Sequence, residues 1–232
     1  MRTRNDIQLT PAGHRLLSHA ENILSAWNRA KHDVAIDTEI ISSLAIAGTP
    51  SLWDICLQDW LHMLHKKQPD LAIHAEVMDA DHILRSVLEG TLDVGFTFEP
   101  PQVPQIHVQQ IANIPLLMVS TQNKLNLEQA LSENYVIVDW GISFSITQAK
   151  YFPNMVAPAI RLPLGRIALD YLLTCGGSAY LAKPTVAKAL QNQRLFLIEN
   201  APVIERSAFA VYPADSQRIA LIQEVLKLFK KV

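Results

Sequence analysis

Apolar residues repeat near the start of the chain at the spacing of a helix. Thr10 and Pro11 suit the N-cap and the first turn, because proline lacks the amide hydrogen that stays unbonded there. A seam with alternating gaps of four and three residues follows, formed by Leu16, Ala20, Ile23, Trp27, Ala30 and Val34. We therefore expect one long helix over residues 11–36. It serves either dimerisation or ordinary packing on its own domain, and the 3-4 alternation favours dimerisation.

From about Thr38 onward, strand-like and helix-like apolar patterns alternate. The predicted elements are strands over 40–47, 71–77 and 92–98 and helices over 51–66 and 80–88. Asp79 suits the N-cap of the second helix, and Gly90 suits its end. The order strand, helix, strand, helix, strand predicts a parallel sheet with right-handed crossovers.

A second run of elements follows the prolines at 100–104. The predicted strands cover 106–111, 114–120, 135–138, 159–163, 178–181, 195–198 and 205–212, and the predicted helices cover 127–132, 143–151, 165–175 and 184–190. Pro115 lies near the start of the second of these strands, and Asp215 suits the N-cap of a last amphipathic helix. We expect an α/β fold of two lobes, lobe I over about 37–118 and 206–232 and lobe II over about 119–205. Because the chain crosses twice between the lobes, we also expect a hinged cleft.

The composition indicates a folded chain that is not, as a whole, a nucleic-acid binder. Apolar residues make up 49% of the chain and the formal net charge is −2, whereas dedicated nucleic-acid binders are basic. Residues 1–31 carry five basic and two acidic side chains, which indicates either a contact with phosphate or chance over a short window.

Cysteine usage and the N-terminal residues indicate a cytoplasmic protein. Cys56 and Cys175 are far apart in sequence, so we expect two buried, reduced thiols. The polar start is unlike an export signal, and the apolar runs are too short to span a bilayer. We therefore expect no membrane partner.

The sequence carries no pattern typical of catalysis. It contains neither G-x-S-x-G, nor a Walker loop, nor G-x-G-x-x-G, so we expect no enzymatic activity. His62 and His65 lie three apart on a predicted helix, but nothing nearby supplies a third metal ligand, so a solvated polar face explains them better. We expect neither metal nor cofactor. Asp93 lies within a predicted strand, where a structural hydrogen bond explains it better than acid–base chemistry.

Polar and aromatic residues gather where predicted strands give way to helices. Free amides at 51–52 and the hydroxyls of Thr49 and Ser51 would form a site for a carboxylate or another anion, unless Thr49 only caps the helix and Ser51 faces solvent. The opposite lobe contributes the start of a helix, and its aromatic residues either line the pocket or belong to the core. The candidate ligand-binding residues are Thr49, Ser51, Leu52, Trp53, Thr97, Phe98, Ile142, Ser143, Phe144 and Gly165.

A pattern near the N-terminus resembles one that many LysR-type transcriptional regulators carry just after the recognition helix. It is formed here by Arg2, Ile7, Leu9, Thr10, Ala12, Gly13, Leu16 and Leu17. Further family-like segments lie in the expected order, at 88–95, at 176–181 with Pro184, and at Tyr212-Pro213. Lys183 departs from the pattern, because the family often has a hydrophobic residue there.

The resemblance implies two Rossmann-like lobes similar to type 2 periplasmic binding proteins, preceded by a long linker helix. Residues 1–10 would be the remnant of a winged helix-turn-helix, with Arg2 and Arg4 of the wing on the DNA backbone and the recognition helix missing. It also implies promoter DNA as a partner of the full-length form, a small-molecule effector, and a homodimer or homotetramer. The alternative is a solute-binding protein of the same fold that does not act on DNA, which would need an export signal.

Overall fold

The computed structural model describes residues 9–13, 16–17, 19–20, 23, 27, 42–155 and 158–231. The described residues between 11 and 27 are helical, and the Thr10 hydroxyl accepts a hydrogen bond from the Gly13 amide at 3.1 Å, which confirms the predicted N-cap. Four residues with a predicted function lie outside the described residues, namely Arg2, Arg4, Ala30 and Val34.

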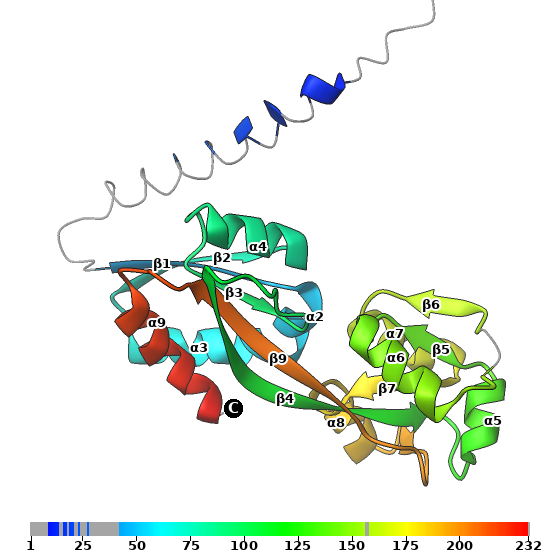
Figure 1. Cartoon of the computed structure of the whole chain (residues 1–232). Helices are drawn as coiled ribbons and strands as arrows, with labels where there is room; N and C mark the ends of the chain where they lie inside the picture. The colour runs from blue at the N-terminus through cyan, green and yellow to red at the C-terminus, as the bar shows by residue number, and fades with distance from the viewer. Residues whose placement is uncertain are drawn as a thin grey trace, which may run out of the picture.

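Lobe I is built on three parallel strands, as predicted, with β1 in the middle (Figure 1). These strands are β1 (Ser42–Gly48), β2 (Leu71–Val77) and β3 (Val94–Thr97). The register places Gly48 opposite both Val77 and Phe96, so the three strands end at the same edge. The crossover helix α4 (Ala80–Leu88) begins at Asp79, whose carboxylate accepts the His82 amide at 2.8 Å.

The predicted helix over 51–66 is divided into three segments. It consists of α2 (Pro50–Leu52), the π-helical segment η1 (Trp53–Leu57) and α3 (Gln58–Lys67). Leu52, Leu57, Trp60 and Leu64 are all fully buried, so the apolar face continues through the change in winding. The apolar pattern alone therefore predicts a single helix and does not reveal the wider π turn.

Two long strands connect the lobes (Figure 1). They are β4 (Ile106–Ser120) and β9 (Ile204–Pro213), paired antiparallel from Ile106 to Leu116 with a register shift between Gln110 and Ala112. The prediction of two separate strands, over 106–111 and 114–120, was therefore wrong. Pro115 lies opposite Glu205 of β9, whereas β7 begins to pair with β4 only at Leu116, so Pro115 has a neighbouring strand on one side only.

Lobe II extends the shared sheet and adds a small parallel sheet. Its elements are α5 (Leu127–Ser132), β5 (Val136–Val138), α6 (Ile142–Tyr151), β6 (Ile160–Leu162), α7 (Gly165–Cys175), β7 (Ser178–Ala182), α8 (Lys183–Gln191) and β8 (Phe196–Leu197). Strands β7 and β8 pair antiparallel with β4, whereas β5 and β6 pair only with each other as strands. The predicted elements of this lobe are confirmed to within one or two residues at each end.

The C-terminal segment packs against lobe I. It comprises α9 (Ile219–Leu226) and the 3-10 helix η2 (Lys227–Lys231). Phe229 stacks on Trp60 with ring centroids 5.0 Å apart, and the Trp60 indole donates to the Val225 carbonyl at 3.0 Å. The predicted N-cap Asp215 was wrong, because the helix begins later, with Arg218 at the N-cap position.

The structure tests the predictions made for three single residues, Asp93, Cys56 and Cys175. Asp93 is buried and accepts the Ala45 amide at 2.7 Å and Arg218 at 3.3 Å, which confirms its structural role. Cys56 is buried, but Cys175 is exposed at the end of α7, so the expectation of two buried thiols was wrong for Cys175. Among the described residues, no helix has both the length and the apolarity needed to cross a membrane.

Candidate functional site

Three segments from distant parts of the sequence meet between the lobes at Glu99. The Thr97 hydroxyl accepts the Glu99 amide at 3.1 Å where β3 ends, which turns the chain toward lobe II. The Glu99 carboxylate then accepts hydrogen bonds from the Ser143 hydroxyl at 3.1 and 3.2 Å, and from the Ser143 amide at 3.4 Å. It also accepts Arg206 Nη2 of β9 at 2.9 Å. We call these three residues, Glu99, Ser143 and Arg206, the inter-lobe junction.

Arg206 is the buried charge of this junction. Only 5% of the residue is exposed, and its guanidinium carbon lies 5.1 Å from the centroid of the Phe98 ring, within the range of a cation–π contact. Its Nε atom is buried and has no hydrogen-bond partner among the described residues. A buried guanidinium keeps its charge and needs partners for its donors. Arg206 is therefore only partly satisfied by Glu99.

Gly141 allows the three partners to approach each other. It is the N-cap of α6 and has a φ of 88° and a ψ of 177°, a region that only glycine adopts readily. A Cβ atom there would lie 2.9 Å from Glu99 Oε1 and 3.1 Å from Arg206 Nη2. The absence of a side chain at Gly141 thus leaves room for the ion pair.

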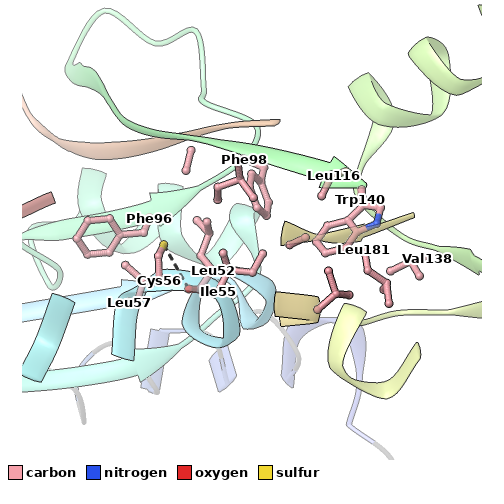
Figure 2. Packing of buried hydrophobic residues seen from close by; sticks show 14 of the residues in the cluster. Leu52, Ile55, Cys56, Leu57, Phe96, Phe98, Leu116, Val138, Trp140 and Leu181 are labelled. Atoms are coloured by element: carbon pink, nitrogen blue, oxygen red, sulfur yellow. Dashed lines mark hydrogen bonds between the residues drawn. The ribbon is translucent and has the colours of Figure 1, made fainter. Parts of the chain in front are cut away.

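An aromatic contact joins the lobes beside the junction (Figure 2). Phe98 meets Trp140 edge to face with centroids 6.5 Å apart, and Trp140 is fixed by a hydrogen bond from its indole to the Tyr180 carbonyl at 2.9 Å. Gly165, a predicted site residue, lies directly under this ring, because a Cβ at Gly165 would be 2.9 Å from the Trp140 ring. Gly165 is buried and supports Trp140 instead of offering a surface to a ligand.

At the start of α2, where an anion site was predicted, two of the predicted residues make hydrogen bonds within the protein. The Leu52 amide already donates to the Thr49 carbonyl at 3.0 Å, and the Leu52 side chain is fully buried in the core. The Trp53 indole donates to the Glu76 carbonyl at 2.8 Å, so this ring is held against β2. The Thr49 hydroxyl makes no capping bond, is itself buried, and has no partner among the described residues, while Ser51 is half-buried.

The predicted residues of α6 lie in three different surroundings. Phe144 is 2% exposed and packs on Tyr180, so of the two alternatives for its ring, pocket wall or core, the structure favours the core. Ser143 belongs to the junction. Ile142 is 72% exposed and borders an open hollow of about 460 Å³. The residues lining this hollow are Asp139, Gly141, Ile142, Ser145, Ile146, Ala149 and Arg161.

A second ion pair between the lobes is longer and more exposed. Arg166 Nε of α7 lies 3.9 Å from Asp54 Oδ1 of η1. Burial raises the pKa of the Asp54 carboxyl above its ordinary value, the Arg166 charge offsets part of this rise, and Asp170 adds to it. This pair therefore holds the lobes together more weakly than the junction does.

Sequence reasoning missed Glu99, Trp140 and Arg206. For Arg206 a signal existed, because Ile204, Ala208 and Ala210 alternate with it on the buried face of β9. An arginine on an apolar face of a strand indicates a buried charge with a partner. His62 and His65 are both exposed, and the described part of the chain contains no cluster of three metal-ligating side chains.

Comparison with known proteins agrees with this architecture. An HTH-type transcriptional regulator HdfR of Yersinia enterocolitica is 29% identical over 237 aligned residues, covering 97% of this chain and 79% of the relative. Full-length CbnR complexed with target DNA matches with a TM-score of 0.74 at 18% identity, over 98% of this chain and 83% of CbnR. The regulatory domain of HypT from Salmonella typhimurium matches at 0.69 and 15% identity, over 83% of this chain and 97% of that domain.

These structures confirm the predicted two-lobe fold. The family described as the LysR substrate binding domain matches residues 39–232, which is most of the chain. The expected resemblance thus extends from the strands of lobe I to the C-terminal helix. This protein belongs to the LysR family through its substrate-binding domain.

Proposed function

We propose that this chain senses a small-molecule effector at the inter-lobe junction and, as part of a LysR-type transcriptional regulator, passes the signal to promoter DNA. The observation that carries the proposal is the buried Arg206 charge, whose partner Glu99 also accepts hydrogen bonds from Ser143 of lobe II. An effector that binds one arrangement of the lobes more tightly shifts the population toward it. The names of the relatives, which are transcriptional regulators, favour this function over solute transport.

A ligand screen tests the location of the site. The chain is screened by thermal shift against small metabolites, and each hit is measured again on Ser143→Ala and on the control Ser132→Ala, whose hydroxyl bonds only within its own helix. We expect the affinity to fall about tenfold in Ser143→Ala, the loss of one hydrogen bond to a charged group, and to stay unchanged in the control. Hits that bind both variants like the wild type would place the site elsewhere.

We also propose that the N-terminal helix pairs with a second copy of the chain. Leu16, Ile23 and Trp27 are apolar yet 68%, 68% and 60% exposed, and they lie on the predicted seam. Sedimentation of the wild type should give a homodimer or homotetramer, and the double variant Leu16→Glu/Ile23→Glu should dissociate. Leu88→Glu, at another exposed leucine, is the control. Unchanged sedimentation of the double variant would contradict the pairing.

The residues before this helix, 1–10, are proposed to contribute DNA-backbone contacts through Arg2 and Arg4. Mobility-shift titrations across salt compare this chain with a form that carries a winged helix-turn-helix upstream. We expect specific binding only from the second form, and a salt slope that falls by about one for each arginine replaced by alanine. Equal specificity of the two forms would contradict the assignment.

A further inference from the structure

We propose that lobe II holds a second binding site, separate from the inter-lobe junction, for a small neutral molecule with one aromatic ring and a hydroxyl group. The site is a pocket between α5, α7 and the amino ends of β5 and β6 (Figure 1). The residues lining it are Leu131, Ser132, Asn134, Tyr135, Val136, Pro158, Ala159, Ile160 and Tyr171. This inference goes beyond the proposed function and does not rest on it.

The pocket and the inter-lobe junction lie at opposite ends of β5. The lining residues from Leu131 to Val136 lie before this strand or at its start, whereas Ser143 lies after its end. Because β6 runs parallel to β5, with Ile160 opposite Val136, its first residues reach the pocket at the same edge. No residue of the inter-lobe junction lines the pocket, so the two sites use different side chains.

The pocket has a buried floor and an exposed rim. Tyr135 and Val136 are 5% and 1% exposed, and Leu131 and Ile160 are half-buried against the same apolar core. The exposed lining residues, which form the rim, are Ser132, Asn134 and Ala159. A pocket that opens to solvent over a buried floor can admit a small molecule and remove most of its surface from water.

The volume of the pocket, about 250 Å³, limits the ligand to about one ring. An apolar cavity of about 150 Å³ is large enough for benzene, whereas the pockets of drug-sized ligands measure about 300–1,000 Å³. Two of the lining residues are tyrosines, Tyr135 before β5 and Tyr171 on α7, and aromatic rings attract each other in edge-to-face and offset arrangements. Size and lining together favour a single aromatic ring.

The pocket offers hydrogen bonds but no charge. None of the nine described residues that line it is charged at neutral pH, so an ionic ligand would lose water without gaining a counter-charge. The side chains of Asn134 and Tyr171 make no hydrogen bond to another described residue, which leaves both available to a ligand. A hydroxyl group both donates and accepts, so it can bond to either side chain.

Titration of the full chain with phenol and with toluene, followed by amide NMR, tests the site. The double variant Asn134→Gly/Tyr171→Phe removes both polar groups, and glycine tolerates the φ of 53° at position 134. The control Asn200→Gly/Tyr151→Phe makes the same two replacements at exposed residues outside the pocket, and Asn200 has a similar φ of 63°. A third variant, Ala159→Phe, adds a ring at the rim.

We expect phenol to shift the amide signals of residues 131–136 and 159–160, with a dissociation constant on the order of 1 mM for so small a ligand. The double variant should bind phenol about tenfold more weakly, because its hydroxyl loses its hydrogen-bond partners, and should bind toluene like the wild type. The control should bind both compounds unchanged, and Ala159→Phe should bind neither. Benzoate, which is charged, should not shift these signals.

Three outcomes would overturn the proposal. If phenol shifts none of these signals, or shifts them equally in wild type and Ala159→Phe, the pocket is not the site. If the double variant binds phenol like the wild type, Asn134 and Tyr171 do not receive the hydroxyl. If benzoate binds in the pocket as tightly as phenol, the ligand class is wrong. None of these measurements involves DNA or the inter-lobe junction, so they hold whether or not the proposed function does.

Discussion

Replacing Gly141 by alanine should disturb both the backbone and the inter-lobe junction. At a φ of 88° and a ψ of 177°, an alanine costs of order 1–3 kcal/mol in backbone strain alone. The new methyl would also lie 2.9 Å from Glu99 Oε1, closer than atoms tolerate. The Glu99 side chain can move aside, because it is flexible and partly exposed, but it then loses its charged hydrogen bonds, worth about 1 kcal/mol in such a setting. We expect the free energy of unfolding to fall by about 2–4 kcal/mol.

Two other glycines separate these contributions. Gly90 has a φ of 71° with nothing within 4 Å of an added Cβ, so Gly90→Ala carries backbone strain only, about 1–2 kcal/mol. Gly165 begins α7 without a positive φ, but its Cβ would lie 2.9 Å from the packed Trp140 ring. Gly165→Ala should therefore cost about 1–3 kcal/mol through overpacking. Urea unfolding at constant pH measures all three variants.

A double-mutant cycle with Glu99→Ala decides whether the contact at Gly141 is real. Once the Glu99 side chain is removed, the methyl of Gly141→Ala no longer displaces it, so the two losses should overlap by about 1 kcal/mol. Strictly additive losses, together with a Gly141→Ala loss no larger than that of Gly90→Ala, would refute the reasoning that Glu99 is held against the start of α6.

Trp60→Ala should lower the free energy of unfolding by about 3–5 kcal/mol in urea titrations, because this fully buried indole joins α3 to the C-terminal segment; a loss under about 1 kcal/mol would contradict that packing. Since the pKa of Asp54 is raised by burial, the contribution of Asp54 to the free energy of unfolding should fall as pH rises from the ordinary value of 3.8 through the raised one. Asp54→Asn should remove this dependence at little expense at neutral pH, because the exposed Arg166 pair contributes little, and an unchanged pH profile would contradict it. With a thiol reagent at pH 8, the exposed Cys175 should react rapidly. Cys56 should react only on unfolding, because burial raises its pKa to about 12. The rapid phase should be lost in Cys175→Ser, which checks the assignment.

The period of the apolar pattern predicted most elements of the fold correctly. The strand over 71–77 and the helix over 80–88 were placed to the residue, because each has one apolar face bounded by turn-forming or capping residues. The pattern failed in two places, where the pairing of neighbouring strands or the winding of a helix decides the course of the backbone. Shortly before Pro115, at 112–113, the prediction broke β4 in two, although a proline is tolerated where one neighbouring strand has not yet begun. Over 51–66 the apolar face stays buried through the π-helical segment, so the apolar pattern did not reveal the change in winding.

The candidate site was predicted less well than the fold, because its residues are polar and their partners are remote in sequence. The predictions relied on chain segments that begin helices, and of these only the start of α6 takes part in the junction, through Ser143. At the start of α2 the Leu52 amide donates to the Thr49 carbonyl, a detail that depends on backbone angles and not on residue type.

Arg206 shows where sequence reasoning ends for this chain. Its alternation with Ile204 and Ala208 places it on the buried face of β9. A buried guanidinium then needs an acidic partner, because an unpaired buried charge is strongly destabilising. The chain contains 22 acidic residues, and nothing in the local pattern selects one that lies 107 positions away. That choice follows from the antiparallel pairing of β3 with β9, which sets Thr97 opposite Phe209 and so brings the loop after β3 toward Arg206. The site thus depends on the order of the strands in the sheet. Glu99 could be predicted as the partner of Arg206 only after that order was known.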